Sequence, residues 1–205
     1  MKFLTKNKDS AVLQQGLTYQ KDKSKNNQRL REMLISEQKN FCAYTEKYLN
    51  GMDTVDVEHF DSSLKYKDDY FNYYAVLSKA NQYKKDEKYK DAPFFKNRFF
   101  QNKDEFDFRV RYVKGGDYEE VDLNDTEAQE LIDFLGFNHE FLHRDRKKHI
   151  KRLDGLFKDA NWNTEKQIEY FQQNRSELSF LTALEVELEL DLSKFYQNPP
   201  QPHDS

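Results

Sequence analysis

Residues 41–60 of this chain read FCAYTEKYLNGMDTVDVEHF, a stretch that ends on the acid-histidine pair Glu58-His59. Aromatic and β-branched residues cluster on both sides of Asn50-Gly51, a dipeptide typical of the tight turn between paired strands. We therefore predict a two-stranded ribbon of residues 41–49 and 55–60, with His59 at its end.

A loop and a short basic helix are expected after the ribbon. No hydrophobic period holds from Asp61 to Asn72, which indicates a loop. Residues 76–89 suit a helix with many exposed lysines, and the candidates for contact with nucleic acid are Lys79, Lys84, Lys85 and Lys88. Between Lys65 and Lys103, ten basic residues stand against five acidic ones, although the whole chain has a net charge of -4. A nucleic-acid partner is therefore compatible with the sequence, because Lys and Arg contacts dominate phosphate binding.

Helical periods occur on both sides of this region. Leu30, Met33 and Leu34 predict a helix over 27–38. Farther on, Thr126 can cap a helix that Gly136 ends, and Asn138 can cap the next one. A further helix is expected from Thr164 to beyond Phe180.

Two segments carry strand signals. Phe106, Phe108, Val110 and Tyr112 alternate with polar residues before Gly115-Gly116-Asp117, and this pattern predicts a second hairpin that continues to Val121 and Leu123. Leu184 to Leu192 alternates apolar and acidic residues, which favours a strand, yet Leu and Glu are also good helix formers. Both conformations stay open for that segment.

The composition indicates a folded protein with an aromatic core. Aromatic residues make up 15% of the chain, with 17 Phe and 13 Tyr, so rings should fill much of the interior. No apolar run is long enough for a signal peptide or a membrane span, and the single Cys42 cannot form an internal disulfide. We expect a cytoplasmic protein with no membrane partner.

Three short strings follow one another in a fixed order: Cys42-Ala-Tyr-Thr45-Glu46, then Val57-Glu58-His59-Phe60, then Asn72 with Ala80-Asn81-Gln-Tyr-Lys84. Together they resemble the ββα-metal finger of HNH nucleases, in particular the PtuB-like proteins of Septu-type anti-phage systems, which pair with an SMC- or ABC-type ATPase. Farther along, 128–142 and Arg146 are similar to the ending of those proteins. The resemblance covers roughly residues 27–155, and its specificity lies in the ordered combination of the strings.

The resemblance implies an HNH endonuclease subunit of a bacterial anti-phage defence system that hydrolyses phosphodiester bonds, in DNA before RNA. His59 would be the general base, and Glu58 and Asn81 would bind Mg²⁺ or Mn²⁺. Asn72 would brace the loop that carries His59, and Lys84 would face the same phosphate. These residue types suit the chemistry, because hydrolysis needs a base for water, a cation for the leaving oxygen and positive charge at the phosphate.

One departure from the family concerns a structural zinc ion. Many relatives hold it with two cysteine pairs, and the corresponding positions here are Cys42, Thr45, Leu77 and Ala80. One thiolate and a threonine cannot hold a tetrahedral zinc, so we predict no structural zinc. We expect an aromatic mini-core in its place, made of Tyr44, Tyr48, Phe60, Phe71, Tyr73, Tyr74 and Leu77.

The expected fold class is α+β, with a ββα-metal (HNH) finger embedded in a mostly helical domain that has an additional β-hairpin. The predicted organisation is an N-terminal segment (1–26), a nuclease module (27–100), a hairpin plus helical C-terminal region (101–196) and a disordered tail (197–205).

Other readings of the same residues stay open. His139-Glu140-Phe141-Leu142-His143 matches the HExxH pattern of zinc metalloproteases, with Glu165 or Glu169 as a third ligand. The charged pair Arg144-Asp145 directly after the second histidine disfavours it. A non-enzymatic alternative is a catalytically silent interaction subunit of an ATPase complex. Taken singly, Asn72 is also a plausible turn former, Asn81 a surface helix residue, and Lys84 a solvated lysine.

Overall fold

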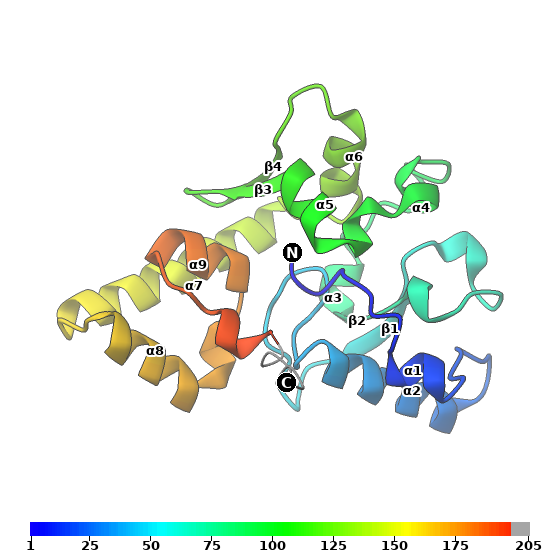
Figure 1. The fold of residues 1–205 in the computed structure, drawn as a ribbon, viewed down its shortest axis with the longest axis horizontal. Helices are drawn as coiled ribbons and strands as arrows, with labels where there is room; N and C mark the ends of the chain where they lie inside the picture. Colours follow the sequence, from blue (N-terminus) through cyan, green and yellow to red (C-terminus); the bar gives the residue numbers. More distant parts are fainter. Residues whose placement is uncertain (198–205) are drawn as a thin grey trace, which may run out of the picture.

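Two antiparallel hairpins set among helices form the fold in the computed structural model, which describes residues 1–197 (Figure 1). β1 (Val55–His59) pairs with β2 (Tyr73–Leu77), and β3 (Val110–Val113) pairs with β4 (Asp117–Glu120). The predicted α+β class is confirmed. None of the helices within residues 1–197 has the length and apolar character needed to cross a bilayer.

The described residues also contain α-helices of very different length and several 3-10 turns. The α-helices are α1 (Ala11–Gln14), α2 (Ser24–Glu37), α3 (Ser78–Asn81), α4 (Phe94–Asn97), α5 (Lys103–Arg109), α6 (Thr126–Phe134), α7 (Glu140–Asp159), α8 (Thr164–Gln173) and α9 (Leu181–Leu188). The 3-10 turns are η1 (Ser62–Leu64), η2 (Tyr70–Asn72), η3 (Phe99–Gln101), η4 (Arg175–Leu178) and η5 (Ser193–Phe195).

The partner of the strand that ends at His59 differs from the prediction. β1 pairs with β2, from Val55 opposite Leu77 to His59 opposite Tyr73, and not with residues 41–49. Residues 41–48 form a turn beside the other edge of β2, where Ala43 N donates a hydrogen bond to Ala75 O (3.1 Å). The physical reason is burial: Tyr73 to Val76 are buried on both faces of the hairpin, and a strand buried on both faces shows no alternation.

The helix predicted over 76–89 is also wrong in extent. β2 continues to Leu77, and α3 is only four residues long. Ser78 Oγ donates to Asp56 Oδ1 (2.7 Å), which ties the start of α3 to β1. Beyond it, Lys85 N donates to Phe134 O (2.9 Å), so the backbone turns toward α6 and leaves the helical path. The loop predicted between Asp61 and Asn72 is present and contains η1 and η2.

The first helix is confirmed as α2, and the second hairpin is confirmed with different limits. Phe106 and Phe108 belong to α5, because the Asn102 side chain accepts hydrogen bonds from two backbone N–H groups of the first turn and caps a helix there. The strands therefore begin at Val110, and β4 ends before Val121.

The later helices begin and end at positions slightly different from those predicted. The N-cap of α6 is Asp125 rather than Thr126, and α7 is capped by His139. Asn138 instead bonds to both backbone groups of Tyr118, at 2.8 and 2.7 Å. α8 ends at Gln173, well before Phe180, and the open segment is helical as far as Leu188. Residues 198–205, most of the predicted disordered tail, lie outside the described residues.

Aromatic rings fill the interior around the first hairpin, as the composition predicted. Phe60, which directly follows β1, is fully buried and packs against the rings of Tyr74, Phe94, Phe95, Phe100 and Phe134. Within the predicted mini-core, Tyr44, Phe60, Tyr73 and Tyr74 are buried, whereas Tyr48, Phe71 and Leu77 are partly buried. The position and direction of β1 are therefore fixed by a rigid ring cluster immediately after His59.

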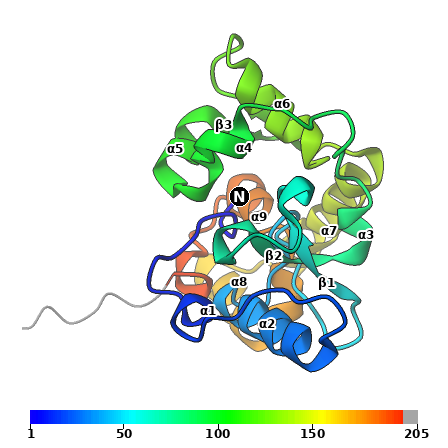
Figure 2. The ribbon, with the colours of Figure 1, turned by 90° about the vertical axis from the view of Figure 1, so that its right-hand side faces the viewer.

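The N-terminal residues pack into the same core. Leu4 and Val12 are fully buried, and the Glu46 carboxylate accepts hydrogen bonds from Lys2 N (2.6 Å) and Thr182 N (2.7 Å). α2 packs against both β1 and β2 (Figure 2). The hairpin therefore packs against the aromatic core, the N-terminal residues and α2.

Candidate functional site

A cleft of about 540 Å³ lies between β1, the start of α2 and the loop after β1. Three of the residues predicted from the sequence, Glu58, His59 and Asn81, line it together. The full lining is Tyr19, Ser24, Asn27, Gln28, Arg31, Val55, Asp56, Val57, Glu58, His59, Lys65 and Asn81. The strand, loop, strand and short helix thus bring residues more than twenty positions apart to one surface.

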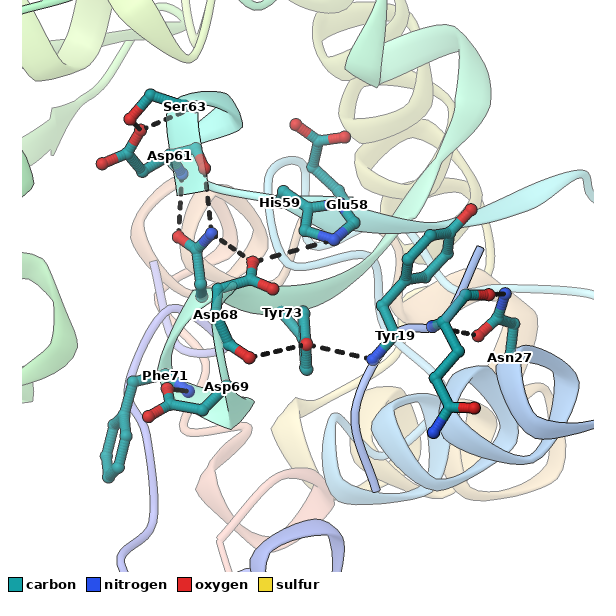
Figure 3. A network of polar contacts seen from close by, with 12 residues as sticks. Tyr19, Asn27, Glu58, His59, Asp61, Ser63, Asp68, Asp69, Phe71 and Tyr73 are labelled. Carbon is teal, nitrogen blue, oxygen red and sulfur yellow. Dashed lines mark hydrogen bonds and ion pairs between the residues drawn. The ribbon is translucent and has the colours of Figure 1, made fainter. Parts of the chain in front are cut away.

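His59 is held on several sides. Its side chain is only 6% exposed, and the rings of Tyr19 and Tyr73 meet it edge-on, with centroids 4.8 and 5.4 Å away. Its Nε2 atom faces Asp68 Oδ2 at 3.7 Å (Figure 3). Burial lowers the pKa of His59, and the Asp68 carboxylate opposes this shift. A neutral imidazole with a carboxylate behind it is the form that a general base requires.

Asn72 holds the loop that follows His59. It is 1% exposed, and its Oδ1 accepts a hydrogen bond from Asp61 N (2.8 Å) while its Nδ2 donates to Asp61 O (2.9 Å). The same Nδ2 donates to Asp68 Oδ2 at 2.6 Å. Asn72 therefore links the backbone directly after His59 to the carboxylate that faces the imidazole.

A second set of hydrogen bonds joins this loop to the N-terminal residues. Tyr19 N donates to Tyr73 Oη (3.0 Å), which in turn donates to the backbone oxygen of Asp68 (3.1 Å) (Figure 3). Tyr73 thus fixes both the ring that covers His59 and the loop that presents Asp68.

An oxygen-rich group occupies the other side of β1. Glu58 points away from the His59 ring (Figure 3), as neighbouring residues on a strand do, and Asp56 lies on the same side as Glu58. Asn81 Nδ2 lies 3.4 Å from Asp56 Oδ2. Burial raises the pKa of Glu58, while the Lys84 ammonium and the Asn81 amide oppose that shift.

The position of Lys84 corrects its predicted role. Its side chain is 1% exposed and its ammonium group pairs with Glu58 Oε1 and with Asp86, at 3.1 Å from the latter. It also donates to His59 O at 2.7 Å. Lys84 is thus a buried partner of Glu58 and lacks the exposure that a phosphate contact requires.

The other predicted lysines lie away from the cleft lining. Lys85 and Lys88 both pair with Asp133 of α6, and Lys79 Nζ donates to Gln82. The cations that do line the cleft are Arg31 and Lys65. Sequence patterns gave no sign of Arg31, because it reaches the site from α2.

The oxygen donors at the cleft are compatible with a hard divalent cation. Asp56, Glu58 and Asn81 offer two carboxylates and a carboxamide, which suit Mg²⁺ that keeps several of its waters. Lys84 Nζ donates to Oε1 of Glu58. Within residues 1–197, no group of three or more His, Cys, Asp or Glu side chains is arranged to hold a metal ion.

The positions that the resemblance matches to zinc-binding cysteines are packed here. Cys42 is buried, and its Sγ accepts a hydrogen bond from Leu77 N at 3.3 Å. Ala80 is buried as well. Burial raises the pKa of the Cys42 thiol, as expected for a thiol that packs like a small apolar side chain.

The arrangement of His139 and His143 does not support the zinc-metalloprotease hypothesis based on the HExxH pattern. His139 is the N-cap of α7 and its ring stacks on Tyr83 with centroids 3.8 Å apart. His143 Nδ1 instead pairs with Asp117 Oδ1 at 2.7 Å. The two imidazoles have different partners, and no described Glu or Asp joins them in a three-ligand group.

Comparison of the chain with protein-family models, with curated proteins and with solved structures finds no match. The functional interpretation therefore depends on the residues of the cleft and on the motif resemblance.

Proposed function

We propose that the protein is a metal-dependent HNH-type endonuclease that hydrolyses phosphodiester bonds in DNA, with RNA as the second substrate class. The observation that carries the proposal is that Glu58, His59 and Asn81 line one cleft while Asn72 braces the loop after His59. Support also comes from the succession of β1, a loop, β2 and the short α3, in which two paired strands precede a helix, although the partner of β1 is not the predicted segment 41–49.

His59 is the residue proposed to activate water. Since Nε2 faces Asp68, Nδ1 is the nitrogen left to accept a proton from a water molecule in the cleft. The resulting imidazolium is stabilised by the Asp68 carboxylate, and the rings of Tyr19 and Tyr73 keep the imidazole from turning. Burial lowers the pKa of His59, so the neutral, basic form is the main one at neutral pH.

The remaining residues position the phosphate. Glu58, Asn81 and Asp56 are proposed to hold Mg²⁺ or Mn²⁺, which supplies charge stabilisation at the phosphate and the leaving oxygen when it is bound. Arg31 and Lys65 lie at the same cleft and can contact non-bridging phosphate oxygens. Lys84 is assigned a different task, which is to keep Glu58 ionised in its buried position.

The test is cleavage of supercoiled plasmid, single-stranded DNA and tRNA in Mg²⁺, by wild type, His59→Ala and Glu58→Gln. His143→Ala is the matched control, because it removes an imidazole outside the cleft. Wild type and the control should cut, and His59→Ala should lose about 10²- to 10⁴-fold in rate. Cutting that survives in His59→Ala would refute the assigned base.

The resemblance alone is the ground for two further parts of the proposal, an SMC- or ABC-type ATPase partner and a role in anti-phage defence. The cleavage assay is therefore run on the protein alone and with such an ATPase. Absence of cutting by wild type in both settings would favour the silent interaction subunit.

A further inference from the structure

Helix α7 carries a row of positive charges on the side opposite its buried face. The buried face consists of Arg146, Ile150, Leu153 and Phe157. The basic residues on the outer side recur at spacings of three, four and seven, which places them on one side of a helix with 3.6 residues per turn. This basic stripe is Arg144, Lys147, Lys148, Lys151 and Lys158, all exposed.

Most of these charges are not neutralised by a neighbour. Lys158 pairs with Asp154 at 2.7 Å, but within residues 1–197 no carboxylate forms an ion pair with Arg144, Lys147, Lys148 or Lys151. By contrast, Lys85 and Lys88 share the carboxylate of Asp133. The stripe is therefore a local excess of positive charge on a chain whose net charge is -4.

A groove of about 670 Å³ runs along the stripe, between α7, the turn after β3 and the end of α9. Its apolar floor includes Ile150 and Leu188. The carboxylates that line it already have partners: Asp154 pairs with Lys158, and Glu187 Oε1 accepts hydrogen bonds from Tyr112 Oη (2.9 Å) and Gly115 N (2.8 Å). The donors to Glu187 are neutral and leave its charge in place, but five Lys and Arg side chains face two carboxylates in the lining, so the net charge of the groove is positive.

The stripe begins next to the candidate nuclease hairpin. Tyr83, two residues after α3, stacks on His139 at the start of α7, with ring centroids 3.8 Å apart. From Arg144 to Lys158 the stripe extends about 21 Å at 1.5 Å per residue. The four cations without an ion-pair partner among the described residues, Arg144, Lys147, Lys148 and Lys151, lie within about 10 Å of this length at 1.5 Å per residue, and such a row fits the repeating charges of a linear polyanion.

We propose that the basic stripe of α7 binds the phosphodiester backbone of nucleic acid outside the cleft. This inference deepens the proposed function and rests on it, because the bound strand would be the one that is cut. Single-stranded and double-stranded nucleic acid both present this backbone, and the experiment below distinguishes between them.

The experiment measures fluorescence anisotropy of a labelled 30-nucleotide strand and a labelled 30-base-pair duplex, in EDTA and across a range of salt concentrations. The test variant is Lys147→Gln/Lys148→Gln/Lys151→Gln. The control is Lys8→Gln/Lys39→Gln/Lys96→Gln, which removes the same charge from exposed lysines of other elements. Because EDTA prevents metal-dependent cutting, failure of the nuclease proposal would leave the binding result unaffected.

Wild type and control should bind alike, and the test variant should bind at least about tenfold more weakly. The slope of log Kd against log salt should fall by about 2 for the single strand or about 3 for the duplex, at 0.7 or 0.9 per lost contact. The ligand whose affinity is lost in the test variant, single strand or duplex, is the form of nucleic acid that the stripe binds. Equal weakening in test and control variants, no binding by wild type, or binding that poly-glutamate displaces as well as unlabelled DNA does would overturn the proposal.

Discussion

Asp68 should act on catalysis through His59, and Asp68→Asn is the change that tests it. The substitution preserves shape and lets the side-chain oxygen still accept from Asn72 Nδ2. It removes the negative charge that lies 3.7 Å from His59 Nε2. The imidazolium formed when His59 accepts a proton then has no counter-charge.

The size of the effect follows from that distance. Unit charges 3.7 Å apart attract by about 4 kcal/mol at an effective dielectric constant of ~20, which is suitable here because both side chains are nearly buried. If half to all of this attraction is realised in the transition state, kcat falls by about 30-fold to 10³-fold, at 1.36 kcal/mol per decade. Because Asp68 opposes the lowering of the His59 pKa, its removal should lower that pKa further.

The assay is kcat for Mg²⁺-dependent cleavage of a labelled oligonucleotide between pH 5 and 9, with the His59 titration followed by NMR. Asp69→Asn is the control, since it makes the same chemical change one residue away and asparagine can still cap η2. In Asp68→Asn, and not in Asp69→Asn, the plateau of kcat against pH should be lower, and the acid limb of that profile should move to lower pH. A plateau and limb equal to those of wild type would refute the assignment of Asp68 as a positioning residue.

Three further outcomes are expected. Lys84→Met should lower the free energy of unfolding by about 3 kcal/mol in urea titrations, because it leaves the buried Glu58 carboxylate without its partner. Lys85→Met, which breaks an exposed ion pair, should lower it by less than about 1 kcal/mol. Equal losses in the two variants would contradict the buried pairing of Lys84 and favour its original role as a phosphate ligand. Burial lowers the pKa of His59 and of His149 in the folded protein. The unfolded chain therefore binds more protons, and the free energy of unfolding should fall as the pH falls below about 6.5. The urea midpoints at pH 5 and pH 7 should accordingly differ less in the double variant His59→Gln/His149→Gln than in wild type. Gly136→Ala should reduce Tm, because Gly136 has φ +63° and a Cβ there would lie 2.9 Å from Tyr83 Cβ, while Gly155→Ala, with open space around it, should leave Tm equal or higher.

Sequence patterns predicted the elements whose burial is one-sided. α2 and α6 have a regular apolar face, and their positions were predicted to within a few residues. Tyr73 to Val76 have none, because both sides of β2 are covered, and the run was assigned in part to a helix. The partner of β1 was also predicted wrongly. Residues 41–49 favour β structure as residues 73–77 do, and only the second segment showed no strand alternation, so the first was chosen.

The candidate site divides in a similar way. His59, Glu58 and Asn81 were selected by an ordered motif, and the structure brings them to one cleft. Asp68, which faces His59, and Arg31 and Tyr19, which line the cleft, were not selected, since each comes from a different segment and carries no local spacing signal. Lys84 was selected with a different role, because a lysine one turn after Asn81 looks exposed until the Glu58 and Asp86 carboxylates are placed around it.

The ring of Tyr19 against His59 has an evolutionary consequence. Tyr19 and Ser24 form part of the cleft wall, yet both precede the part of the chain that resembles HNH nucleases. The imidazole of His59 and this part of the cleft wall thus come from separate stretches of the sequence. Substitutions in the first two dozen codons would change the wall of the cleft beside His59 and leave the codons of Glu58, His59 and Asn81 untouched.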